Sequence, residues 1–401
     1  MKKLLILGGS RYIVPVIKTA KELGIYTITC DYLPDNIAHK YSDKYVNASV
    51  IDKDRILEIS KELKIDGIIS FACDPGVVTA AYVAEKMNLP FQGSYESVKI
   101  LQNKGLFRKF LNDNGFNCPH AKSYTNINEP FDDIEYFNWP VIVKPCDSAG
   151  SKGVTKVEKP EDLKGAISYA LDNSLNKSFI IEDYINRKGY HSSSDIFIVD
   201  GKIKFITYCD EFNDASSSNP FAPTNDVHPS TMKLENQKQL TKELQRLMDL
   251  LKMKNGIFNV DACVGIGNIP YIMEVSPRGG GGKVAEIQHM AYGVDLIKRE
   301  IQSAVGLPID AFEEYKCDGV WVLMSIHLKS KKGGKLKEIY IDPLIKEKNL
   351  KMMDVIVKQG DYIEPYTGEN MAIGSLFLRF DSREELNRVL PLEDNWLKVI
   401  V

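Results

Sequence analysis

Short apolar runs alternate with amphipathic stretches through the first hundred residues. The apolar runs cover residues 4–7, 26–30 and 67–70, and helical patterns lie near 14–23, 53–63 and 76–87. This alternation predicts a parallel sheet with helices packed on it, in an α/β unit. The turn after the first run, residues 8–11, does not follow the Gly-x-Gly-x-x-Gly pattern, so dinucleotide binding is a weak alternative.

The hydrophobic pattern changes further along the chain. Residues 235–251 carry an amphipathic helix whose apolar face should pack against a sheet. From about residue 313, short strand patterns return before a closing helix near 383–390. These strands are expected at 320–327, 336–341, 354–357 and 372–380. We therefore predict three domains, covering residues 1–100, 101–312 and 313–401.

Residues 210–230 form a polar stretch rich in Ser, Asn and Pro. A structureless segment of this length inside a compact domain is usually functional or mobile. We expect it to be a lid or a loop that contacts the substrate. His228 lies within it, and a lone loop histidine is expected to be exposed and without a chemical role.

Composition indicates a soluble enzyme. The chain has 401 residues, of which 44% are hydrophobic, and can bury large cores. A net charge of −3 gives no basic excess, so we expect no nucleic-acid partner. No apolar run reaches the roughly 18–20 residues of a membrane helix, and the first run is too short for a signal peptide. The seven cysteines form no Cys-x-x-Cys pair, which favours the reducing cytoplasm.

Two acidic residues lie on neighbouring predicted strands. Asp261 falls in the apolar run 256–262, and Glu274 closes the run 270–274, with a turn at 265–268. If the strands pair, both carboxylates project from one face of the hairpin. They then repel one another unless a cation lies between them, and Mg²⁺ prefers such hard oxygen ligands. Arg278, four residues beyond Glu274, would face an anion held by the metal.

A second cluster suits a phosphate chain. A buried-type strand ends at Lys144 and runs into residues 146–154, a loop rich in Gly and Ser whose backbone N–H groups could approach phosphates. No Gly-Lys-Ser/Thr follows, so this is not a Walker motif. Lys104 opens an amphipathic helix, a position that the helix dipole disfavours unless an anion is near. The apolar strand 178–185 could provide an adenine slot, with Glu182 as an acceptor.

Together these motifs resemble the ATP-grasp superfamily over nearly the whole chain, most closely its biotin-carboxylase-like and carbamoyl-phosphate-synthase-like branch. The resemblance implies an ATP-grasp fold: an N-terminal parallel-sheet α/β domain, a central nucleotide-binding domain of two subdomains, and a small β-rich C-terminal α+β domain. It also implies ATP and two Mg²⁺ ions as cofactors, with Mn²⁺ as an alternative metal.

The resemblance assigns roles to individual residues. Lys104 and Lys144 would bind phosphates, and Ser151 and Gly153 would cover them. Glu182 would hold adenine with the backbone of Asp183, Tyr184 and Ile185. Asp261 and Glu274 would bind Mg²⁺, and Arg278, with Lys152, would stabilise the oxyanion of the reaction.

Three features depart from the family pattern. Ser276 stands where the family usually has Asn, as a weaker metal ligand. His191 occupies the position that is often an acid on the ribose, which leaves ribose recognition open. Four glycines at 279–282 could receive a substrate carboxylate or act as a hinge. Asp31 and Asp74 follow strands of the first domain and could hold the second substrate, although each also suits a solvated loop acid or a helix cap.

The expected activity is an ADP-forming ligase that activates a small carboxylate as an acyl phosphate and joins it to an amine or similar nucleophile. Two alternatives remain open: an enzyme that phosphorylates bicarbonate, and a non-catalytic ATP-binding protein. Homodimers are common among such enzymes, but no surface stripe in the sequence establishes one.

Overall fold

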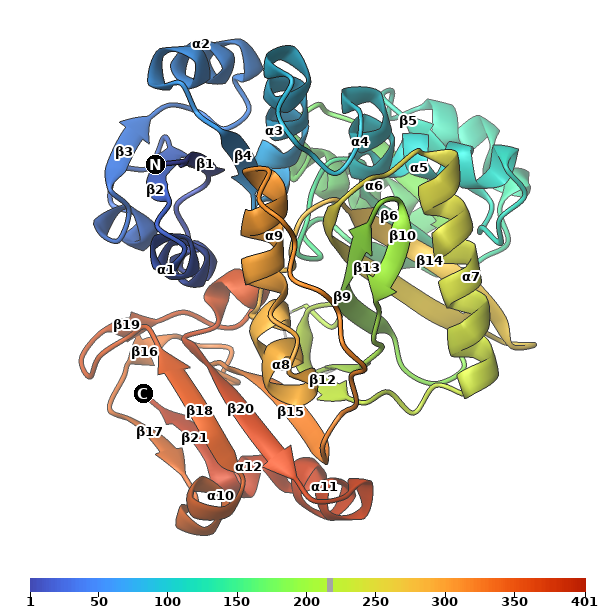
Figure 1. The fold of residues 1–401 in the computed structure, drawn as a ribbon. Helices are drawn as coiled ribbons and strands as arrows, with labels where there is room; N and C mark the ends of the chain where they lie inside the picture. Colours follow the sequence, from blue (N-terminus) through green and yellow to red (C-terminus); the bar gives the residue numbers. More distant parts are fainter. Residues whose placement is uncertain (215–218) are drawn as a thin grey trace.

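The N-terminal unit is a parallel sheet with helices on both faces. The computed structural model describes residues 1–214 and 219–401 (Figure 1). The strand order is β3-β2-β1-β4, and all three pairings are parallel, as predicted. The strands are β1 (Lys3–Leu7), β2 (Tyr26–Asp31), β3 (Lys44–Asn47) and β4 (Gly67–Ser70), and the helices are α1 (Val14–Glu22), α2 (Lys53–Leu63) and α3 (Asp74–Met87).

Helix α3 begins immediately beyond β4. Asp74 is the first residue of α3 and Pro75 the second, so the N-cap position belongs to Cys73, whose side chain makes no capping bond. Reading Asp74 as the cap is therefore wrong by one position. Its carboxylate is free of the capping role and is directed to other partners.

Two further sheets form the centre of the molecule. The first has the order β5-β8-β6-β7 and packs against α5 and α6, and the second has the order β10-β9-β13-β14. The first set is β5 (Ala121–Tyr124), β6 (Val141–Pro145), β7 (Thr155–Val157), β8 (Phe179–Asp183), α5 (Lys104–Asp113) and α6 (Leu163–Asp172). The second set is β9 (Ser192–Val199), β10 (Lys202–Phe205), β13 (Gly256–Gly265) and β14 (Ile269–Ser276).

Four helices cover the second central sheet. They are α4 (Tyr95–Gln102), α7 (Leu234–Leu250), α8 (Val284–Tyr292) and α9 (Leu296–Ala304). The apolar face predicted for residues 235–251 packs in one core with Phe258 and Val275, as expected. Helix α9 packs against α1 and β13, so Leu4 and Ile6 share a continuous core with Ile257. The N-terminal unit is thereby docked on the central sheet.

The C-terminal region shares a sheet with the polar segment of the central region. The order is β11-β12-β15-β20-β18, and Val227 of β12 pairs with Val322 of β15. The strands are β11 (Asp210–Asn213), β12 (Pro223–His228), β15 (Val320–Ile326), β18 (Leu350–Val355) and β20 (Gly374–Phe380). Strands β11 and β12 therefore belong structurally with the C-terminal strands, on the far side of the predicted boundary near residue 313.

The expectation that residues 210–230 are structureless is wrong, because β11 and β12 pair antiparallel across it. His228 is fully buried beside Tyr292 and is not an exposed loop residue. Part of the expected lid, residues 215–218, lies outside the described residues.

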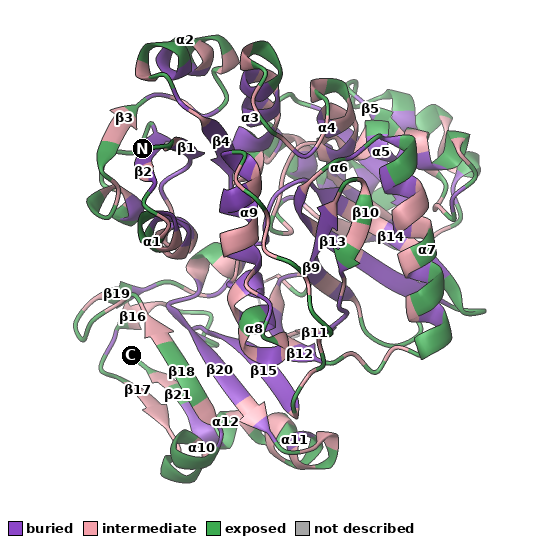
Figure 2. Cartoon of the chain, viewed as in Figure 1, coloured by how far each residue is buried: buried purple, intermediate pink, exposed green. Residues whose placement is uncertain are grey.

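Small elements complete the C-terminal region. Two two-stranded sheets pair β16 with β19 and β17 with β21. The elements are β16 (Gly334–Lys335), β17 (Glu338–Ile341), β19 (Tyr362–Ile363), β21 (Leu397–Ile400), α10 (Pro343–Lys348), α11 (Arg383–Val389) and α12 (Glu393–Trp396). Figure 2 shows that buried residues line the inner strands, while exposed residues lie on the outer helices. No described helix combines the length and the apolar character that crossing a membrane requires.

Candidate nucleotide-binding and catalytic site

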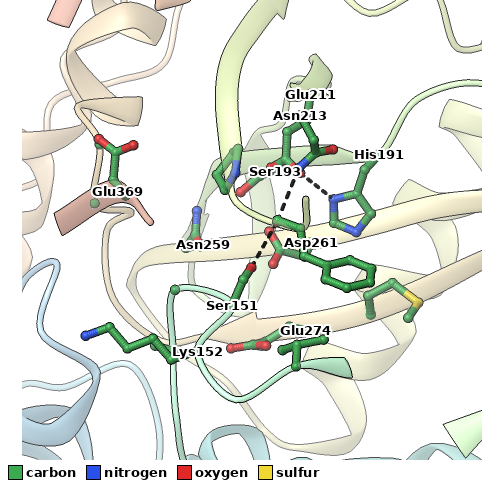
Figure 3. Close-up of a pocket in the computed structure, with 18 of the residues that line it drawn as sticks. Ser151, Lys152, His191, Ser193, Glu211, Asn213, Asn259, Asp261, Glu274 and Glu369 are labelled. Atoms are coloured by element: carbon green, nitrogen blue, oxygen red, sulfur yellow. Dashed lines mark hydrogen bonds and ion pairs between the residues drawn. The ribbon is translucent and has the colours of Figure 1, made fainter. Parts of the chain in front are cut away.

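A cavity of about 630 Å³ lies where the central sheets, the start of α3 and the shared C-terminal sheet converge. Its lining includes most of the residues singled out from the sequence. They are Lys104, Lys144, Ser151, Lys152, Glu182, Asp183, Tyr184, Ile185, His191, Asp261, Glu274 and Arg278. Gly153 and Ser276 do not line it. Figure 3 shows part of this lining, with Glu369 across the cavity from His191.

Asp261 and Glu274 lie directly opposite each other on the β13–β14 hairpin. The turn at 265–268 joins the two strands as predicted, and a register shift follows Asp261. Opposed residues on paired strands project to the same face. Asp261 Oδ1 is buried and has no hydrogen-bond partner among the described residues. Burial raises the pKa of this carboxyl, and the charges of Glu211 and Glu274 raise it further.

Lys104 neutralises Glu274. Its Nζ lies 3.0 Å from Glu274 Oε2 and donates to the Ser148 carbonyl at 2.9 Å. Burial by itself would lower the pKa of Lys104, but the Glu274 carboxylate raises it above its ordinary value. This contact explains the unusual lysine at the start of α5, since an anion sits beside it. Asn103 caps the helix by accepting the Leu106 N–H at 3.0 Å.

Lys144 is paired with Glu182 on the neighbouring strand β8. The other Glu182 oxygen accepts from Arg108 Nε at 2.9 Å. Burial would raise the pKa of Glu182, but the charges of Arg108 and Lys144 lower it to about 2. Both carboxylate oxygens are thus occupied by cations, and Glu182 is not free to accept from an adenine in this arrangement.

The end of β8 and the residues after it line the cavity at Asp183, Tyr184 and Ile185. The Asp183 side chain accepts from Asn138 Nδ2 at 2.7 Å. The N–H groups of Asp183 and Tyr184 donate to carbonyls of His120 and Pro140, at 2.9 and 3.0 Å. These bonds hold the segment against the sheet.

The Gly/Ser loop crosses one side of the cavity with an unusual backbone. Ser151 has φ of 56° and Gly153 has φ of 72°, both in the left-handed region. A Cβ on Gly153 would lie 2.8 Å from Pro145 Cγ, so only glycine fits there. Ser151 Oγ donates to the Phe221 carbonyl at 3.1 Å, which ties the loop to the segment before β12. Lys152 lies on the cavity side of this loop.

Arg278 is held by Asp74 from the N-terminal unit. Its Nε and Nη2 donate to the two Asp74 oxygens at 2.9 and 2.7 Å. Burial would raise the pKa of Asp74, but Arg278 lowers it below its ordinary value. Ser276 joins the same network and is 1% exposed, with its hydroxyl bonded to Asp74 and Gln102. This arrangement departs from the expected role of Ser276 as a metal ligand.

His191 lies on the cavity wall beside Glu211. Its Nδ1 is 3.3 Å from Glu211 Oε1. Burial would lower the pKa of His191, but Glu211 raises it above the ordinary value. Glu211 therefore favours the protonated form of His191, at the position where the family often has an acid.

Several residues of the site escaped sequence reasoning. Arg108 is an interior position of α5 with no distinguishing local pattern. Asp226 lines the cavity from β12, and Glu369 lines it from the short turn before β20. Burial raises the pKa of both carboxyls. Asp195, which accepts the Gly280 N–H at 2.9 Å, braces the four-glycine turn from β9. Only the pairing of distant strands brings these acids to the site.

No group of three or more His, Cys, Asp or Glu side chains in residues 1–214 and 219–401 has the arrangement of a metal cage. Mg²⁺ is usually bound by one or two carboxylates plus substrate phosphates and water. The buried, unpartnered Asp261 Oδ1 opposite Glu274 is the feature that fits such an ion.

Comparison with known families identifies the central region. Residues 101–282 match the model described as ATP-grasp domain. The chain contains an ATP-grasp domain. Among curated proteins it is similar to an ATP-grasp enzyme of Aspergillus fumigatus, with 22% identity over 58% of this chain and 44% of that protein. It is also similar to the carbamoyl phosphate synthase large chain of a Thermoanaerobacter species, with 24% identity over 57% of this chain and 20% of that protein.

This chain matches less than half the length of these two relatives, whereas solved structures match it over its whole length. An L-amino acid ligase from Bacillus licheniformis superimposes with a TM-score of 0.83 at 20% identity, covering 100% of this chain and 98% of that chain. A phosphoribosylglycinamide synthetase from Anaerococcus prevotii gives 0.77 at 22% identity, covering 100% and 99%. The ATP-grasp fold of this chain thus extends beyond the matched residues to the N- and C-terminal regions.

A third structure carries ligands of the expected kind. The biotin carboxylase domain of a 2-oxoglutarate carboxylase from Hydrogenobacter thermophilus, solved with MgADP and bicarbonate, gives a TM-score of 0.75 at 16% identity. It covers 100% of this chain and 91% of that chain. These likenesses support the predicted α/β and α+β fold class.

Proposed function

We propose that this chain is an ADP-forming ligase that phosphorylates a small carboxylate with ATP and passes the acyl group to an amine. The observation that carries the proposal is the facing pair Asp261 and Glu274, which lies in one cavity with Lys104, Lys144 and Arg278. Two carboxylates, two lysines and an arginine on one cavity suit a metal-bound triphosphate and a second anion.

Asp261 and Glu274 would hold Mg²⁺, and Mn²⁺ has the same preference for oxygen ligands. We propose two ions, with Glu274 between them. When bound, the metal neutralises the phosphate charge that would repel an incoming carboxylate. Asp261 fits this role because its buried oxygen lacks a donor, and Glu274 fits because its carboxylate faces Asp261 on the paired strand while Lys104 contacts one of its oxygens.

The remaining residues bind and orient the reactants. Lys104 and Lys144 would contact the phosphates. The loop with Ser151, Lys152 and Gly153 would close over them, and the segment beyond β8 would hold the adenine by its backbone. Exclusion of water by this loop matters because water destroys an acyl phosphate. Holding the two reactants in line can lower the barrier by about 7–11 kcal/mol.

Arg278 would act in the second step of the reaction, the attack of the amine on the acyl phosphate. The substrate carboxylate attacks the γ-phosphorus, which releases ADP and leaves an acyl phosphate. The amine then attacks the acyl carbon and expels phosphate. Arg278 would stabilise the oxyanion of that step, and Lys152 would assist from the loop. No side-chain nucleophile is required.

A screen of ADP release tests the proposal. The purified chain is incubated with MgATP and pairs of small carboxylates and amines, including amino acids. We expect ADP and phosphate only when both a carboxylate and an amine are present. ATP binding without ADP release across the panel would instead indicate a non-catalytic nucleotide-binding protein.

A bicarbonate-phosphorylating enzyme is the second candidate, because the chain is similar to carbamoyl phosphate synthase large chains. ADP release that depends on bicarbonate and needs no amine would favour it.

Light scattering of the same sample would measure oligomeric state, and a dimer is our expectation. We expect the protein to act in the cytoplasm on small molecules.

A further inference from the structure

The ion pair between Asp74 and Arg278 joins two regions far apart in the chain. Asp74 opens α3 of the N-terminal unit, and Arg278 follows β14 of the ATP-grasp domain. The side chains are 21% and 9% exposed, respectively, and both oxygens of Asp74 accept from the guanidinium. A two-point contact of this kind fixes the plane of the guanidinium as well as its position.

Arg278 keeps donors available on its other side. The two bonds to Asp74 and one from Nη1 to the Gly279 carbonyl at 3.0 Å use three of its five N–H groups. Because Arg278 lines the cavity, the remaining N–H groups can reach an anion placed there. Asp74 therefore holds the guanidinium without blocking it.

Asp74 is itself held by Ser276. The Ser276 hydroxyl donates to Asp74 Oδ1 at 2.9 Å and accepts from Gln102 Nε2 at 2.5 Å. The chain of bonds thus runs from Gln102 at the end of α4, through Ser276 and Asp74, to Arg278. These side chains come from three parts of the chain, the end of α4, the start of α3 and the end of β14 with Arg278 just after it, which meet only in the folded molecule.

We propose that Asp74 is a positioning residue for Arg278, and that Ser276 belongs to this positioning network instead of the metal site. The catalytic role of Arg278 in this inference rests on the proposed function. The contacts of Asp74 with Arg278 and Ser276 do not depend on it. The consequence of the inference is that the N-terminal unit supplies part of the catalytic apparatus: Arg278 is correctly aimed only when that unit is docked.

The kinetic test replaces Asp74 by Asn, which keeps the size of the side chain and removes its charge. We expect kcat to fall about 100-fold, the order of loss that a displaced catalytic group causes. Calorimetric affinity for MgATP should stay unchanged, whereas the melting temperature should fall because Arg278 loses its buried counter-charge. Asp74→Glu, which retains the carboxylate, should recover part of kcat. A fall in MgATP affinity that matches the fall in kcat would overturn the positioning role.

Asp43→Asn is the matched control. Asp43 is also an acid of the N-terminal unit held by a cation, Lys21 at 3.0 Å, but it does not line the cavity. This variant should keep wild-type kcat. In the Arg278→Lys background, Asp74→Asn should add little further loss, since the two residues act through one contact. Full additivity of the two losses would overturn the proposal.

A crystal structure of Asp74→Asn with MgADP gives a readout that needs no turnover. We expect the guanidinium of Arg278 to leave the position it holds here. An unmoved Arg278 would overturn the inference, whether or not the wild-type chain releases ADP. If the wild-type chain releases no ADP but Arg278 moves in Asp74→Asn, the result would count against the proposed function and not against the positioning role. Ser276→Ala should lower kcat in the same direction and leave the Mg²⁺ dependence unaltered, whereas a raised Mg²⁺ requirement would return Ser276 to the metal site.

Discussion

Arg108 Nε on α5 lies 2.9 Å from Glu182 Oε2 at the end of β8, and each side chain is only 3% exposed. Arg108 Nη1 also donates to the Met273 carbonyl of β14 at 2.8 Å. One buried cation therefore links a helix, the sheet that carries Lys144 and the strand that carries Glu274. The two halves of the ATP-grasp domain meet at this residue.

Arg108→Met should destabilise the fold by about 3–5 kcal/mol, because it leaves a buried carboxylate with one counter-charge in place of two. Urea denaturation measures the change. Arg55→Met is the control, since its partner Glu58 is 64% exposed and surface pairs contribute at most about 1 kcal/mol. Equal effects of the two substitutions would contradict the structural importance of the buried pair.

Lys144→Ala should weaken MgATP binding by about 10- to 100-fold, the loss expected for a hydrogen bond to a charged group. Isothermal titration calorimetry checks this. Glu182 stays paired with Arg108, so the fold should persist at a lower stability. Lys122→Ala, on strand β5 of the same sheet and paired with Asp133, should leave affinity unchanged. Wild-type affinity in Lys144→Ala would remove this lysine from the phosphate site.

Glu274→Gln should abolish ADP release while the chain stays folded. The substitution removes a charge that would bridge the metal ions and deletes no core packing, since the Glu274 side chain is 30% exposed. Activity assays and thermal melting measure the two effects. Glu243→Gln on α7, at 25% exposure and outside the cavity, is the matched control and should retain activity. Near-native turnover of Glu274→Gln would make the metal assignment wrong.

Two glycines of the Gly/Ser loop offer a paired test of the backbone. Gly150 and Gly153 both have positive φ, 68° and 72°. A Cβ at Gly150 meets nothing within 4 Å, whereas one at Gly153 meets Pro145 and Asn173 at 2.8 and 2.9 Å. Gly150→Ala should cost about 1–2 kcal/mol from backbone strain, and Gly153→Ala about 1–3 kcal/mol more from the clash. Chemical denaturation of both variants gives the comparison, and equal losses would contradict the close approach.

Stability should fall with rising pH because of Glu300. Burial raises its pKa to about 8, from an ordinary value of 4.5, while it accepts from Gln92 and the Ile257 N–H. Between pH 4.5 and about 8, Glu300 therefore keeps its proton in the folded state and has lost it in the unfolded state. This stabilisation is complete below pH 4.5 and is lost as pH rises through about 8, at up to about 1.4 kcal/mol per pH unit.

Glu300→Gln should flatten that slope in denaturation curves measured between pH 5 and about 8. The slope that remains belongs partly to Asp195, whose pKa burial raises to about 7. An unchanged slope in Glu300→Gln would show that Glu300 is ionised in the folded state.

Local patterns in the sequence were sufficient for the parallel N-terminal sheet, helix α7 and the β13–β14 hairpin. Each depends on contacts between residues close in the chain or on one apolar periodicity. The hairpin in particular placed Asp261 opposite Glu274, because a short turn allows few registers for the strands that it joins. The same reasoning was wrong for residues 210–213 and 223–228, because these strands are polar and β12 pairs with β15, about a hundred residues later in the chain.

The sequence by itself determined the β13–β14 hairpin, strand β6 and the Gly/Ser loop, together with the charged residues that each carries. Turn chemistry and side-chain alternation act over only a few residues, so they can be recognised locally. Only the tertiary structure decided how these charged residues are partnered. Glu182 holds Lys144 and Arg108, and Arg278 is held by Asp74. Electrostatic partners are chosen by distance in space and by burial, and the packing of α3, α5 and the central sheets brings these groups together out of water.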